Sequence, residues 1–97
     1  MTPQEREVFN KALNEYGINS QKMMCIEECA ELTNALAKLQ RGRVGQMDII
    51  TEIADVSIMV DQMAIFFGED KFLEERQRKV NRLEERLRKC ELKIQPQ

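Results

Sequence analysis

The amino-acid sequence predicts an all-α protein, a four-helix chain that forms an oligomeric helical bundle. Charged residues make up 33% of its 97 residues, with only 4 Gly and 2 Pro, a composition typical of helical chains. Apolar residues recur at helical spacing along four segments that glycines separate. A chain this short forms one domain, residues 1–97, with a modest core that oligomerisation commonly enlarges. We therefore expect a homodimer or homotetramer.

The composition also excludes several classes of function. The net charge of -2 argues against binding to a nucleic acid polymer. No apolar run approaches the roughly 20 residues that span a bilayer, and residues 1–5 are too polar and acidic for a signal peptide. We expect a cytoplasmic protein with no membrane partner, in which the 3 Cys are reduced thiols. The absence of His removes the usual general base and zinc ligand.

The first predicted helix has a strong start signal and a clear end. Thr2 can cap it, Pro3 suits the first helical position, and Glu5 can complete a capping box. The helix runs to about Tyr16 and stops at Gly17. Its single apolar stripe predicts packing and no chemistry.

Three longer helices follow. A cap at Asn19 or Ser20 begins the second, which runs to about residue 41 before a glycine. After a short loop, Met47 or Asp48 begins the third, which runs to about residue 67. The fourth begins near residue 69 or 70 and ends in the low nineties.

The second helix carries an acid where an apolar side chain is expected. On a helical wheel, Glu28 falls in the middle of the apolar face, and Glu31 falls at its edge, about 60° away. Glu27 points outside this face, toward Asn34 and Lys38, and is expected to be exposed. Glu28 is therefore the anomalous residue, although a rim carboxylate on a loosely packed face is an open alternative.

The third helix repeats this design. Glu52 lies within its apolar face and Asp55 lies at the margin, three residues later. Asp61 projects the opposite way, and Asp48 is expected to be a helix cap rather than an outer acid of the site.

The two acid pairs together predict a magnesium site. The short loop makes the two helices antiparallel neighbours, so Glu28 and Glu31 meet Glu52 and Asp55. Isolated acids are rarely buried unless they are paired or bind a metal, and clustered carboxylates repel one another unless a cation neutralises them. Magnesium prefers such oxygen ligands, and a cation held in this way suggests a phosphate substrate.

The fourth helix combines a heptad pattern with dense charge. Its apolar side chains repeat at a and d positions, interrupted by Arg76: Leu73, Val80, Leu83, Leu87, Cys90 and Ile94. Most of its charges are expected to form a solvated face with i,i+4 ion pairs. The functional alternative is that a few basic residues reach a phosphate group.

The order of the acidic motifs resembles a known family. Residues 27–32 (EECAEL) followed by residues 52–56 (EIADV) are similar to the signature of the MazG-like all-α nucleoside triphosphate pyrophosphohydrolases. That superfamily includes dimeric dUTPases and phosphoribosyl-ATP pyrophosphohydrolase. The resemblance covers the second and third helices well, and the fourth more loosely. It implies a bundle made by dimerisation and hydrolysis of a (d)NTP between the α and β phosphates, giving the monophosphate and pyrophosphate.

The resemblance also implies roles for individual residues. Glu28, Glu31, Glu52 and Asp55 would be the catalytic magnesium ligands. The substrate-binding residues would lie on the fourth helix, where the Lys-x-x-Arg element and its neighbours resemble the family's phosphate contacts: Lys79, Asn81, Arg82 and Arg86. Aromatic residues that some relatives stack on a base are not evident near the motif, so the base preference is open.

Two hypotheses from other classes stand beside the enzyme. The heptads of the fourth helix are also typical of a non-enzymatic helical oligomerisation or partner-binding module. A carboxylate-bridged redox di-metal site is weaker, because the chain lacks the His that such bundles use.

Overall fold

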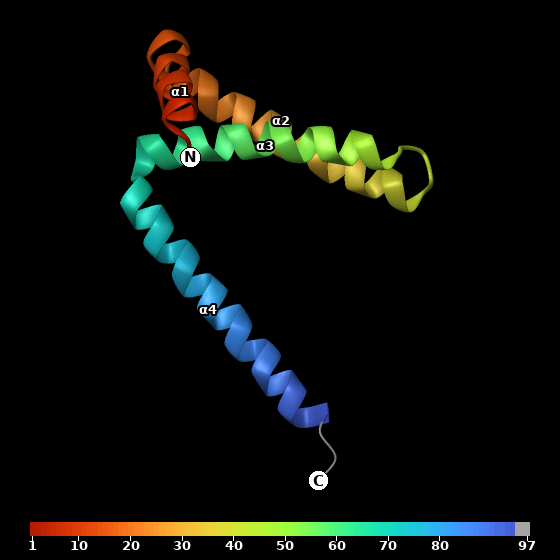
Figure 1. The fold of residues 1–97 in the computed structure, drawn as a ribbon. Coiled ribbons are helices and arrows are strands. Elements are labelled where there is room, and N and C mark those ends of the chain that lie inside the picture. The colour runs from red at the N-terminus through yellow and green to blue at the C-terminus, as the bar shows by residue number, and fades with distance from the viewer. Residues whose placement is uncertain (95–97) are drawn as a thin grey trace. The chain divides into compact units, whose positions relative to one another are not determined.

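The computed structural model describes residues 1–94 of the chain, and in this part four α-helices and no strands occur (Figure 1). The helices are α1 (Pro3–Tyr16), α2 (Ile18–Gln40), α3 (Gln46–Phe67) and α4 (Glu69–Ile94). The predicted all-α fold class is confirmed. The chain divides into two compact units, Met1–Phe67 and a second unit that begins at Gly68. The second unit consists of α4, and a lone helix has no core of its own.

The N-terminus of α1 carries the predicted capping box. The backbone N–H of Glu5 donates to Thr2 Oγ1 at 3.0 Å, and the backbone N–H of Thr2 donates to Glu5 Oε1 at 3.4 Å. Pro3 occupies the first turn, where its missing N–H costs nothing. At the other end Gly17 adopts a φ of 84°, and its N–H donates to the Leu13 carbonyl at 3.0 Å. The predicted start and end of this helix are confirmed.

The predicted start of α2 was wrong. The helix begins at Ile18, so Asn19 and Ser20 lie within its first turn instead of capping it. Gly17 is the N-cap and has no side chain that could cap. Because this one glycine ends α1 and begins α2, no separate capping residue stands between them.

The link from α2 to α3 is short. α2 ends at Gln40, and α3 begins at Gln46, one residue earlier than the sequence predicted. Asp48 is the third residue of α3, and its Oδ2 accepts a hydrogen bond from the Gly45 N–H at 2.8 Å. Asp48 therefore caps the helix start from within the first turn, where its negative charge also complements the helix dipole.

α2 and α3 form an antiparallel pair that holds the first unit together, and α1 packs against both (Figure 1). In the described part of the chain the buried apolar side chains are few: Phe9, Ile49, Met59 and Ala64. Beside them Gln21 of α2 donates to Gln62 of α3 through a buried side-chain hydrogen bond of 2.6 Å. Many apolar side chains of this pair stay exposed, among them Ile53 at 52%. The predicted homo-oligomer, which would cover them, stays a prediction.

α4 is a strongly amphipathic helix within its own unit. Its charged face carries two of the expected i,i+4 ion pairs, Glu84 with Arg88 at 3.2 Å and Glu85 with Lys89 at 3.5 Å, and an i,i+3 pair of Glu75 with Arg78. Most of its charges thus form a solvated face, as predicted. None of the helices in the described part of the chain combines the length and the apolar character that crossing a membrane requires.

Candidate metal centre

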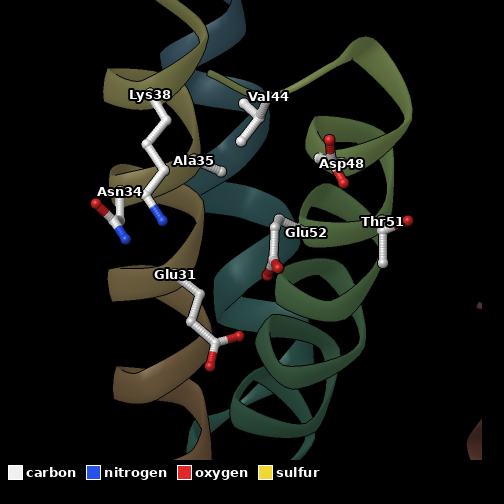
Figure 2. A pocket seen from close by; sticks show the side chains of 8 residues that line it. All are labelled: Glu31, Asn34, Ala35, Lys38, Val44, Asp48, Thr51 and Glu52. Carbon is white, nitrogen blue, oxygen red and sulfur yellow. The ribbon is translucent and has the colours of Figure 1, made fainter. Parts of the chain in front are cut away.

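Three carboxylates converge between α2 and α3. Glu28 and Glu31 lie one turn apart on α2, and Glu52 lies on α3. Each of the three offers a carboxylate oxygen, and these oxygens all lie within 4.8 Å of one another. Figure 2 shows Glu31 and Glu52 reaching from their two helices into the space between them. The two acidic motifs therefore meet as predicted, because a short loop turns α3 back along α2.

Two oxygens in this cluster are buried without a partner. Glu28 and Glu52 are half-buried, whereas Glu31 is exposed. The Oε2 atoms of Glu28 and Glu52 have lost their contact with solvent and accept no hydrogen bond. Leaving an ionised oxygen in this state is costly unless a cation or a proton satisfies it. The alternative, in which Glu28 is a rim carboxylate on a loosely packed face, does not account for the burial of its Oε2 atom.

The electrostatics of the cluster follow from the same geometry. Burial, and then the charge of Glu31, raise the pKa of Glu28 above its usual value. The same two causes, in the same order, raise the pKa of Glu52. Each group must give up solvation and stand close to other negative charges, so its charged form is disfavoured until a cation neutralises it.

Asp55 lies beside the cluster and does not belong to it. Its side chain is half-buried, and its charge contributes to the raised pKa values of both Glu28 and Glu52. The group of mutually close oxygens, however, comprises only the three glutamates in the part of the chain that the structure describes. Of the four ligands that the sequence predicts, the structure therefore brings three together and places the fourth nearby.

A cleft of about 330 Å³ opens next to the cluster, on the side nearer the α2–α3 loop (Figure 2). Its lining comes from both helices and the loop: Glu31, Asn34, Ala35, Lys38, Val44, Asp48, Thr51 and Glu52. Two of the predicted metal ligands thus form one end of this cleft. A ligand bound there would touch the acids directly.

Sequence reasoning missed Lys38. The wheel grouped Lys38 and Asn34 with Glu27, outside the apolar face. Glu27 is exposed as expected, whereas Lys38 is half-buried and both it and Asn34 line the cleft. Lys38 follows Glu31 by seven residues, which on a helix is a rotation of only about 20°. That spacing was the available signal, because a side chain two turns from an acid at the margin faces the same way.

The predicted substrate-binding residues all lie on α4 and are exposed: Lys79, Asn81, Arg82 and Arg86. Asn81 Oδ1 accepts a hydrogen bond from Gln77 Nε2 at 3.0 Å. Because α4 forms the second unit, the approach of these residues to the acids stays a prediction.

The cysteines are free thiols, but they are not the buried thiols that the sequence predicted, because Cys29 and Cys90 are exposed and Cys25 is only half-buried. Cys25 and Cys29 stand one turn apart on α2, and burial, followed by the proximity of Cys29, raises the pKa of Cys25. A raised thiol pKa disfavours the thiolate form that nucleophilic or metal-binding cysteines need.

The cluster suits a hard divalent cation. Its donors are all carboxylate oxygens, two of them buried and unsatisfied, and magnesium prefers oxygen ligands on rigid supports. The two helices provide such supports. The residues present therefore fit a divalent cation that takes oxygen ligands, and its identity as magnesium stays a prediction.

Comparison with known proteins adds no identification. No family model, curated protein or solved structure matches the chain. The likeness of residues 27–32 and 52–56 to the pyrophosphohydrolase signature stays a prediction from the sequence.

Proposed function

We propose that this chain is a magnesium-dependent nucleoside triphosphate pyrophosphohydrolase that cleaves a (d)NTP to the (d)NMP and pyrophosphate. One observation carries the proposal: Glu28, Glu31 and Glu52 converge, and two of their buried oxygens have no partner. An apolar helix pair gains nothing from such acids unless they bind something. The cleft beside them offers space for a ligand.

In this proposal Glu28, Glu31 and Glu52 would hold the cation, and Asp55, on the next turn of α3 after Glu52, lies beside them. Bound magnesium polarises a phosphoryl oxygen and offsets the negative charge of the substrate. Asp55, which lies outside the group of three, accepts the proton of the attacking water. This chemistry needs no Ser, Cys or His nucleophile, in keeping with a chain that has no His.

The basic side chains of α4 are the proposed phosphate contacts. Lys79, Arg82 and Arg86 make no ion pair within 4 Å in the described part of the chain, and Asn81 lies on the same helix. Their exposed charges suit the phosphates of a nucleotide. We propose that a homodimer or homotetramer covers the exposed apolar side chains.

The test is a nucleotide panel with matched variants. Pyrophosphate release from NTPs, dNTPs and phosphoribosyl-ATP is measured with magnesium and with chelator, together with the nucleotide co-product. Glu28→Gln should abolish release, whereas Glu27→Gln, which alters the exposed neighbour on the same helix, should leave it unchanged. Turnover that survives Glu28→Gln or needs no metal would contradict the proposal, as would folded wild-type protein that releases no pyrophosphate.

A second candidate function has its own observation. The apolar stripe of α4 is exposed within its unit, with Leu83 and Leu87 at 56% each, and suits a non-enzymatic oligomerisation or partner-binding module. The melting temperature with and without magnesium separates the two candidates. A metal site predicts stabilisation that saturates with magnesium, and a plain helical module predicts no response beyond that of ionic strength.

A further inference from the structure

The cleft next to the acidic cluster contains one cation that the proposed function has not used. Lys38 is the only basic side chain among the cleft-lining residues that the structure describes. It is half-buried and has no ion pair within 4 Å in that part of the chain. A lysine in a cleft with three acids would ordinarily pair with one of them, so its position calls for an explanation.

The direction of the Lys38 side chain indicates where its ammonium group lies. In Figure 2 it runs along α2 from the loop end of the cleft toward the level of Glu31. Its Cα stands about 10 Å beyond that of Glu31 along the helix axis, and helical side chains lean back toward the N-terminus. The ammonium group therefore occupies the same cleft as the carboxylates and lies nearer the loop.

The chemistry of the lining decides which part of a nucleotide would lie against Lys38. None of the cleft-lining side chains in the described part of the chain is aromatic, and only Ala35 and Val44 are apolar. That lining offers little surface on which a nucleobase could stack. A lysine ammonium is a compact charge with three donors, which suits phosphate oxygens. A ligand with several negative charges beside three carboxylates also needs such a cation near its far end.

We infer that Lys38 forms a polyphosphate subsite at the loop end of the cleft, where it binds the terminal phosphates that leave as pyrophosphate. This inference rests on the proposed function for the identity of the substrate. It assigns to α2 a role that the sequence placed on α4 alone. Lys38 would neutralise the charge that develops on the leaving group, while the carboxylates act at the other end of the phosphate chain.

The test uses inorganic pyrophosphate, which is the proposed leaving group without its nucleoside. Its binding to the full chain is measured by titration calorimetry in magnesium, for the wild type and for Lys38→Met and Lys38→Gln. The expected result is about tenfold weaker binding in both variants, the usual effect of one lost charge-assisted hydrogen bond. Lys38→Arg should retain most of the affinity. Lys22→Met removes an exposed lysine of the same helix outside the cleft and should bind as the wild type does.

The outcomes separate this inference from the proposed function. Pyrophosphate binding that is absent in the wild type, or equal in wild type and Lys38→Met, would overturn the subsite whatever the nucleotide panel shows. A selective loss of binding in the two Lys38 variants would support it, even if the panel found no hydrolysable nucleotide and the proposed function failed. Where nucleotides are turned over, Lys38→Met should lower kcat/KM by about the same tenfold, and an unchanged value would contradict the subsite.

Discussion

Magnesium binding to the acidic cluster should weaken steeply as the solution is acidified. The metal binds ionised carboxylates, whereas burial and neighbouring charges raise the pKa of both Glu28 and Glu52 above the usual 4.5. Between 4.5 and those raised values, each of the two carboxyls must lose its proton before it binds metal. The apparent affinity then changes by up to about tenfold per pH unit for each proton displaced, or about a hundredfold for both.

Titration calorimetry in buffers of different ionisation enthalpy measures this proton count directly. The wild type should release up to two protons per bound ion in that interval, and Glu52→Gln should release one fewer with a shallower pH dependence. Glu27→Gln, whose side chain is exposed on the same helix as Glu28, should match the wild type. A magnesium affinity that stays constant on acidification, with no proton release, would refute the reasoning about the cluster.

Magnesium at 100 times its dissociation constant should stabilise the folded protein by about 2.7 kcal/mol. For a chain of this size that is a rise in Tm of about 10–20 °C, which scanning fluorimetry would measure. An equal rise in a Glu28→Gln protein would contradict the prediction. Without metal, the raised pKa values of Glu28 and Glu52 mean that the folded state holds protons more tightly than the unfolded state. In urea titrations these two groups should therefore contribute stability that rises as the pH falls from neutral toward 4.5 and is lost as the pH rises through the raised values. Glu28→Gln should show less of this dependence than the wild type, and an unchanged dependence would refute the assignment. Gln62→Leu should lower the free energy of unfolding by about 1–3 kcal/mol, because it leaves the buried amide of Gln21 without its hydrogen-bond partner. Changing both glutamines to Leu should recover most of that loss in the same urea titration.

The sequence predicted the helices well because their boundaries depend on local chemistry. Thr2, Pro3 and Glu5 form a capping box by spacing alone, and Gly17 ends α1 where its lack of a Cβ allows a positive φ. The start of α2 could not be found in this way. A polar residue that follows a glycine looks like a cap on any local criterion, and only the turn of the chain at Gly17 shows that the glycine serves both helices.

The acidic cluster was partly predictable for a different reason. A wheel shows that Glu28 and Glu52 sit on apolar faces, and a short loop implies that those faces meet. A wheel does not give the level at which side chains from two helices meet. Hence Asp55 was expected among the ligands but lies beside the three glutamates, and Lys38, to which the sequence assigned no site, lines the cleft. Both depend on how far α3 is shifted along α2.

The buried amide pair fixes that shift. Aliphatic contacts alone specify such a shift weakly, because exchanging one apolar side chain for another of similar volume usually costs less than about 1.5 kcal/mol. Gln21 and Gln62 cannot slide, because a one-turn displacement would break their 2.6 Å hydrogen bond and leave two amides without partners inside the core. The same displacement would carry Glu52 about 5.4 Å along α2, away from the oxygens it now meets. This hydrogen bond lies outside the cluster and sets the register of the helix pair. A substitution of Gln21 or Gln62 would therefore displace the carboxylates relative to one another without changing any of them.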